Sequence, residues 1–327
     1  MEVIVAVRSI HIGAAVLVAG AGAFEFLVWP RNGQADAVRP AVSRWLRVST
    51  AWALAVALLT WAVWLVLIAA SMSAASPSLE VLEKVLAQTN FGHVWILRFS
   101  LGLLVAIELG LRGQRKLPLR LLGAAAAALF LVSLAWAGHA VAAQPPSRAL
   151  HLGADACHLL GAGLWLGALL PLCFVLGRAR GATGQAWLAP AAAAARNFST
   201  VGVVAVLTLL ISGVANTVFQ VGSFSALLDT AYGQRVSAKI VLFLAIILIA
   251  IYNRVRLVPR IEATGPAVLY RNAIVEVALG GAIIVLVGML GNMAPSSHRH
   301  EPGMQHTLSP WAPGPNAASA RMHSPMA

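Results

Sequence analysis

The stretch His139–Gly167 reads HAVAAQPPSRALHLGADACHLLGAGLWLG and lies where one long apolar segment ends and the next begins. It contains three of the nine histidines, a cysteine and an aspartate in a largely apolar setting. A helix that crosses a bilayer needs about 20 apolar residues. The stretch therefore predicts the start of a membrane-spanning helix that carries imidazoles at one end.

The composition extends this interpretation to the whole chain. Of its 327 residues, 59% are hydrophobic and only 10% are charged, whereas soluble domains carry about 25% charged residues. The formal charge of +12 does not indicate nucleic-acid binding, because the basic residues lie in short loops between apolar segments. We expect a polytopic membrane protein whose main partner is the lipid bilayer.

Eight apolar segments are long enough to span a bilayer as helices. Their continuous apolar runs favour helices over the alternating pattern of a β-barrel. The predicted spans are about 3–29, 48–71, 91–111, 119–141, 149–177, 197–219, 234–255 and 268–294. The predicted fold class is an all-α polytopic membrane protein.

The distribution of basic residues predicts the orientation. Most arginines lie in the loops after the first, third, fifth and seventh spans, whereas the alternate connections hold few bases. Cytoplasmic loops are enriched in lysine and arginine. We therefore expect both termini outside the cytoplasm. Glu2, His11 and Glu25 in the first apolar run argue against a signal peptide and for a retained first helix.

Short motifs recur between the two halves of the chain. Thr89-Asn-Phe-Gly92 is followed by Arg98, and Thr230-Ala-Tyr-Gly233 by Lys239, each base six residues after the glycine. These matches favour two parallel four-helix repeats, as in some transporters, although chance similarity among Ala/Leu/Gly-rich helices is the alternative. The expected units are 1–145, 146–294 and a disordered, His/Met-containing periplasmic tail over 295–327.

Five histidines, His11, His93, His139, His151 and His158, fall at or near the outer ends of their predicted helices. Imidazole suits copper, zinc and iron. The simpler alternative is that each histidine sits at the membrane interface for its own solvation. Taken together, the five predict a metal-capture site at the outer rim.

The sharpest local pattern is His151, Asp155 and His158, which form one stripe on a helix. Asp155 is expected either to bind the ion or to orient an imidazole. Trp165 continues the stripe deeper into the membrane. A solvated helix end is the alternative, and it applies most to His151.

Sulfur ligands narrow the choice of metal. Met289 and Met293 lie near the outer end of the last span, and Met72 ends the second. Thioether together with imidazole favours a copper ion over zinc or magnesium. The tail repeats this chemistry in His298, His300, Met304, His306, Met322, His323 and Met326.

Acidic residues inside membranes are costly and usually functional. Glu25 and Glu108 lie toward the cytoplasmic ends of their spans, and Glu276 lies inside the eighth. Glu25 and Glu108 are a possible ion path; the alternative is that they pair with loop arginines. Arg98 and Lys239 are either structural counter-charges or groups that repel a cation.

The chain shows no nucleophile–base pair, phosphate loop or dinucleotide fingerprint in a workable position, so we do not expect an enzyme. Gly163 and Gly167 form a small-xxx-small pattern that indicates close helix packing.

Several of these motifs resemble the CopD family of copper-resistance membrane proteins. The resemblance rests on His158-Leu-Leu-Gly-Ala-Gly-Leu-Trp165-Leu-Gly167, Ser212-Gly213-Val-Ala-Asn216, Thr230-Ala-Tyr232-Gly233 with Lys239, and Asn253-Arg254. It implies an inner-membrane protein that moves copper from periplasm to cytoplasm. It also implies a periplasmic copper carrier of the CopC type as partner, here as a separate chain.

The predicted function is therefore copper transport for copper homeostasis and resistance. Two alternatives remain open. Histidines near helix ends also ligate haem b in membrane electron-transfer proteins, and a copper-binding sensor or assembly protein needs no transport.

Overall fold

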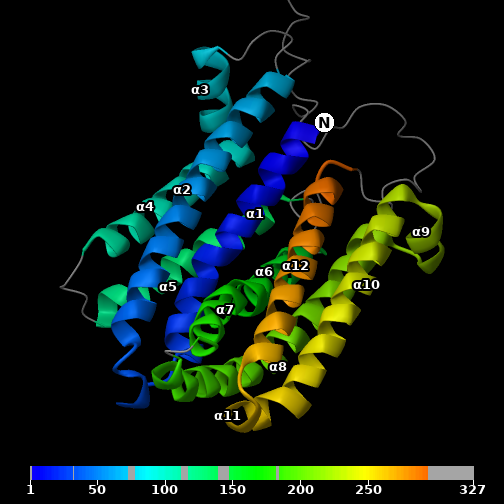
Figure 1. Ribbon diagram of the computed structural model, residues 1–327. Helices are drawn as coiled ribbons and strands as arrows, with labels where there is room; N and C mark the ends of the chain where they lie inside the picture. Colours follow the sequence, from blue (N-terminus) through cyan, green and yellow to red (C-terminus); the bar gives the residue numbers. More distant parts are fainter. Residues whose placement is uncertain are drawn as a thin grey trace, which may run out of the picture.

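The computed structural model describes residues 2–31, 33–72, 78–111, 117–138, 147–181 and 184–293, and within them the chain forms helices without strands (Figure 1). In these residues, eight helices are long and apolar enough to cross a membrane. Each corresponds to one predicted span, so the predicted all-α polytopic fold is confirmed.

The first four spans lie in residues 2–137. They are α1 Glu2–Ala23 with a π-helical turn Phe24–Val28, α2 Arg39–Met72, α4 Asn90–Gly110, and α5 Leu117–Val132 with a 3₁₀ turn Ser133–Ala137.

The other four spans lie in residues 147–290. They are α6 Ser147–Ala162 continuing through a π-helical turn Gly163–Gly167 into α7 Ala168–Ala179, α8 Gln185–Val221, α10 Ala231–Tyr252 continuing through further turns to α11 Ile261–Thr264, and α12 Ala267–Leu290.

Two helices begin earlier than predicted. Helix α2 starts at Arg39 instead of near 48, and α8 starts at Gln185 instead of near 197. The early turns of α2 bury Val42 and Leu46, and those of α8 bury Ala191, all in one apolar cluster. A stripe that recurs once per turn stabilises a helix without making a continuous apolar run, and the span prediction required such a run.

The short helices α3, Leu79–Gln88, and α9, Phe224–Asp229, were not predicted. Figure 1 shows both at the end of the bundle where the chain begins. Each leads directly into a spanning helix capped by a threonine: Thr89 accepts from Gly92 N–H at 3.0 Å, and Thr230 accepts from Gly233 N–H at 2.9 Å. The Thr-x-aromatic-Gly motif is thus the same helix start in both halves. The division into two repeats stays a prediction, and its boundary near 145 lies outside the described residues.

Helix α1 lies at the centre and joins the two halves. It packs against α2 and α5 on one side and against α7, α12 and the 163–167 turn on the other (Figure 1). At the crossing, a Cβ added to Gly20 would overlap the backbone of Gly167, and one added to Gly167 would overlap the carbonyl of Val16. Gly163 likewise lies against Leu131. The prediction that Gly163 and Gly167 serve close packing is confirmed.

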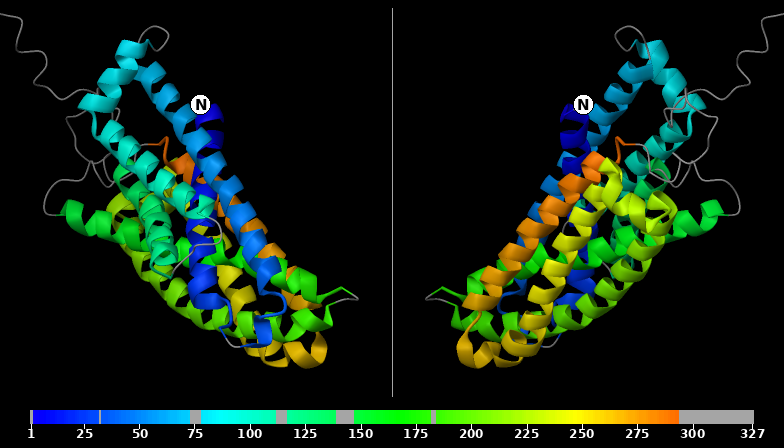
Figure 2. Two further views of the ribbon diagram at one scale, coloured as in Figure 1. Left: turned by 90° about the vertical axis from the view of Figure 1, so that its left-hand side faces the viewer. Right: turned by 90° about the vertical axis from the view of Figure 1, so that its right-hand side faces the viewer.

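The start of α1 and the end of α12 lie together. Arg8 donates to the carbonyl of Gly291 at 2.5 Å and to Asn292 Oδ1 at 2.9 Å. Both side views in Figure 2 show the N-terminus at the end of the bundle opposite α11. The compartment that this end faces stays a prediction, and the predicted tail lies outside the described residues.

Candidate functional site

The structure distributes the predicted ligands over several elements. His11 lies on α1, His93 at the start of α4, and His151, Asp155 and His158 on α6. Within the described ranges, no three His, Cys, Asp or Glu side chains lie close enough together to hold a metal ion. His11, His93 and His158 therefore do not form the shared capture site expected from separate spans. His139 lies outside the described residues.

His11 is fully buried and its ring is bonded at both nitrogens. Nδ1 lies 2.9 Å from the carbonyl oxygen of Ala57 and 3.1 Å from Thr60 Oγ1. Nε2 lies 2.7 Å from the guanidinium of Arg98. Because a guanidinium only donates, Nε2 is the acceptor and Nδ1 carries the proton. The lone pair that would bind a metal is already engaged.

Arg98 is also fully buried, at 0% exposed. Besides His11, it donates to the carbonyl of Phe130 at 2.6 Å and to Ser133 Oγ at 2.7 Å. Its guanidinium lies 4.7 Å from the ring centroid of Trp61 and 4.4 Å from that of Phe130. Carbonyl, hydroxyl, imidazole and aromatic faces together form a cage for this cation.

His158 repeats the Nδ1 anchor of His11 and differs at Nε2. Ser212 donates its hydroxyl to the Thr208 carbonyl, so its oxygen accepts from His158 Nδ1 at 3.0 Å. Thr60 is arranged in the same way, with its hydroxyl donated to Val56. The His158 ring is also hydrogen-bonded to the Leu209 backbone, as His11 is to that of Ala57. No hydrogen bond reaches Nε2 of His158 from any described residue, so its lone pair is open.

Asp155, one turn before His158, adds an acidic oxygen to this site. Its carboxylate is hydrogen-bonded to Asn216 of α8 and interacts electrostatically with Lys239 of α10. The amide oxygen of Asn216 is buried and bonds to no described residue. We call Asp155, His158, Asn216 and Lys239 the α6–α8–α10 cluster. In this cluster the Lys239 ammonium interacts electrostatically with Asp155 and His158, and Asp155 is hydrogen-bonded to Asn216.

His151 lies one turn further out on α6 and is buried. Its ring stacks on Phe219 with centroids 4.8 Å apart, and Gln220 donates to its Nε2 at 3.4 Å. Tyr232 in turn donates to the amide oxygen of Gln220 at 2.5 Å. The predicted stripe is thus present, but its outermost member already has a protein partner.

No described contact joins His93, Met289 or Met293 to this cluster. His93 is exposed, with Nε2 3.3 Å from the Ala87 carbonyl. Met289 is 37% exposed, and Met293 packs beside Tyr232 and Leu290. The predicted His/Met-containing tail over 295–327 lies outside the described residues.

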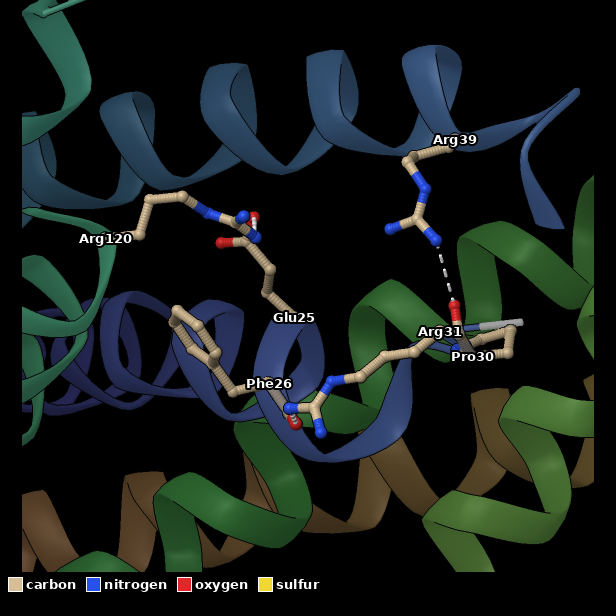
Figure 3. Close-up of polar contacts among 6 residues, drawn as sticks. All are labelled: Glu25, Phe26, Pro30, Arg31, Arg39 and Arg120. Atoms are coloured by element: carbon tan, nitrogen blue, oxygen red, sulfur yellow. Dashed lines mark hydrogen bonds and ion pairs between the residues drawn. The ribbon is translucent and has the colours of Figure 1, made fainter. Parts of the chain in front are cut away.

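Glu25 and Glu108 line a cavity of about 50 Å³ between α1, α2, α4 and α5, together with Arg47 and Arg120. Glu25 is paired with Arg120 at 2.7 Å, as the alternative reading of this acid anticipated (Figure 3). In Figure 3, Arg31 and Arg39 lie near the same helix end, bonded to the carbonyls of Phe26 and Pro30. The predicted ion path therefore lies in the first half, away from His158.

Glu276 of α12 is the buried acid of the second half. It accepts from Asn253 at 2.7 Å and is hydrogen-bonded to Trp165, which follows His158 by two turns. Asn272 donates to the Asn253 oxygen at 2.8 Å. A polar contact chain thus runs deeper into the bundle below the α6–α8–α10 cluster.

Two residues of the site, Ser212 and Asn216, were not proposed as functional from the sequence. Ser212 and Asn216 have a signal, because their i, i+4 spacing places them on one face of α8. The sequence carries no signal for the contact between Arg98 and His11, because the two residues lie on different helices.

Comparison with known proteins decides the family. A family model described as Copper resistance protein D matches residues 192–290, and one described as Copper resistance protein D-like, N-terminal domain, matches residues 1–149. Copper resistance protein D of Pseudomonas syringae pv. tomato is 32% identical over 247 residues, which cover 71% of this chain and 78% of that protein. The chain belongs to the copper resistance protein D family.

Two further relatives extend the comparison. Inner membrane protein YebZ of Escherichia coli is 32% identical over 212 residues, covering 64% of this chain and 70% of that protein. Copper transport protein CutJ of Bacillus subtilis is 26% identical over 262 residues, covering 74% of this chain and 46% of that protein. No solved structure matches the chain. The predicted resemblance is confirmed, and a copper-related membrane function follows from the family.

Proposed function

We propose that this protein carries copper across the inner membrane from the periplasm to the cytoplasm and thereby serves copper homeostasis and resistance. The observation that carries the proposal is the Nε2 of His158, which bonds no described residue, in a cluster with Asp155 and Asn216 where α6, α8 and α10 meet. Buried ionisable residues in membrane helices commonly mark ion pathways. The names of two relatives, a copper resistance protein and a copper transport protein, support copper as the substrate.

The proposed route stays within the second half of the bundle. Copper arrives near His151, binds at Asp155 and His158, and passes Trp165 toward Glu276. The hydrogen bonds that join Trp165, Glu276 and Asn253 support this order. The ion path predicted at Glu25 and Glu108 lies in the other half and is not part of this route.

The proposed orientation rests on the basic residues. Arg120 and Arg196 pair with Glu25 and Glu262 at the end of the bundle opposite the N-terminus. Clustered bases favour the cytoplasmic side, which places both termini in the periplasm. The name of the E. coli relative supports the inner membrane. We propose a CopC-type carrier as the periplasmic copper donor and no catalytic activity for this chain.

The test is copper accumulation in sealed membrane vesicles of known sidedness. Right-side-out vesicles that contain the protein should accumulate copper faster than vesicles without it, and inside-out vesicles should not. Copper that binds to the purified protein without accumulating in either vesicle would support the sensor or assembly alternative. A Soret band in the purified protein would support the haem alternative.

A further inference from the structure

Each half of the bundle anchors one imidazole through Nδ1, and the two halves differ in what lies at Nε2. His11 and His158 both donate from Nδ1 to a helix hydroxyl, and each ring also bonds the backbone three residues before that hydroxyl. The Nε2 of His11 accepts from the guanidinium of Arg98, whereas the Nε2 of His158 bonds no described residue. The sequence motif that positions Arg98 on α4 positions Lys239 on α10.

We propose that only the second half binds copper, because Arg98 permanently occupies the ion position of the first half and Lys239 is the exchangeable cation of the second. The inference deepens the proposed function and rests on it for the identity of the ion. It assigns Arg98 a structural role and Lys239 a role in setting copper affinity.

The cage around Arg98 explains why it does not exchange. A guanidinium stays charged in proteins and presents donors in a rigid plane. Arg98 uses that plane for three acceptors and stacks between Trp61 and Phe130. Moving it would leave the buried Nε2 of His11 and Oγ of Ser133 without this donor, which is unfavourable.

The surroundings of Lys239 are looser. An ammonium is a compact charge on a flexible stem, and Lys239 has the same intermediate exposure as Asp155 and His158. It interacts electrostatically with Asp155 and His158, yet within the described chain it forms no ion pair within 4 Å with Asp155. It can therefore neutralise Asp155 when copper is absent and move aside when copper arrives.

The unsatisfied acceptor at Asn216 is the second, independent indication of an ion. Its amide nitrogen is used by Asp155 while its buried oxygen lacks a described partner. Buried unsatisfied polar atoms in native structures call for an explanation such as an ion or a water. Imidazole nitrogen with carboxylate and amide oxygen is a donor set that suits Cu(II), so Cu(II) is the probe.

The experiment compares the same substitution in both halves. Full-length wild type, His158→Gln and His11→Gln are purified in detergent and titrated with Cu(II), with bound metal counted after desalting. Glutamine retains an acceptor for Arg98 in the first half but removes the nitrogen ligand in the second. We expect His158→Gln to weaken binding by at least about tenfold and His11→Gln to leave it within about twofold of wild type. Equal losses in both variants, or a larger loss in His11→Gln, would overturn the inference.

A second pair of variants, both at Lys239, tests the inference without changing either histidine, so its result does not depend on the stability of the histidine variants. Lys239→Arg introduces a fork that can bond His158 Nε2 as Arg98 bonds His11, so copper affinity should fall at least about tenfold. Lys239→Met removes the competing charge, so affinity should stay equal or rise. Weaker binding in Lys239→Met than in Lys239→Arg would overturn the role of Lys239.

The inference and the proposed function can fail separately. If wild type binds one Cu(II) at His158 but vesicles accumulate no copper, the inference stands and the proposed transport is wrong. If the protein transports copper but His158→Gln binds Cu(II) as tightly as wild type, the inference is wrong and the proposed function stands.

Discussion

The close crossing of α1 with the 163–167 turn predicts that alanine at either of its two glycines destabilises the protein. Gly20 and Gly167 approach so closely that an added Cβ on either would overlap backbone atoms of the other segment. Backbone moves less readily than a side-chain tip, so alanine at either position should force the two halves apart. The same turn carries Trp165, whose hydrogen bond to Glu276 belongs to the proposed route.

The magnitude follows from two opposed effects. Alanine in place of glycine favours a helix by up to about 1 kcal/mol. Overpacking costs about 1–3 kcal/mol and sometimes more, and backbone overlap belongs at the upper end. The expected net loss for Gly20→Ala or Gly167→Ala is about 1–2 kcal/mol, which corresponds to a decrease in Tm of roughly 2–8 °C.

The assay is thermal denaturation of the detergent-purified protein, monitored by the fraction that remains monodisperse. Gly202→Ala is the matched control, because a Cβ there meets nothing within 4 Å; its Tm should equal or exceed that of wild type. If Gly20→Ala and Gly167→Ala were as stable as Gly202→Ala, the close crossing would not exist as described.

Three further predictions concern single side chains. Ser212→Ala removes the side-chain acceptor for His158 Nδ1, so Cu(II) affinity should fall by up to about tenfold in a titration, and unchanged affinity would contradict the orienting role of Ser212. Glu276→Gln should leave Cu(II) binding intact but slow vesicle accumulation, because Glu276 lies below the binding cluster on the proposed route; wild-type accumulation would remove Glu276 from it. Glu25→Gln breaks a partly exposed ion pair with Arg120, so the free energy of unfolding should change by less than about 1 kcal/mol and copper accumulation should persist; lost accumulation would return Glu25 to the ion path.

Sequence patterns predicted the membrane architecture well and the contacts between helices poorly. All eight spans were predicted because a continuous apolar run is a local property. The first turns of α2 and the short helices α3 and α9 were missed because their apolar residues recur only once per turn or over few residues.

The site shows the same division. The stripe of His151, Asp155 and His158 was predicted because helical spacing fixes it. The engagement of His11 by Arg98 depends on how α1 and α4 are both packed against α2 and α5, which no local pattern encodes. The expected convergence of His11, His93 and His158 failed for that reason, since each of these rings bonds residues on its own neighbouring segments.

The most direct test of the account is copper accumulation in right-side-out vesicles by His158→Gln, with Cys157→Ala on the adjacent, exposed position of α6 as control. The account predicts accumulation at the wild-type rate for Cys157→Ala and a decrease of at least about tenfold for His158→Gln. Accumulation by His158→Gln at the wild-type rate would contradict it, because copper would then cross the membrane without using the only imidazole nitrogen proposed to receive it.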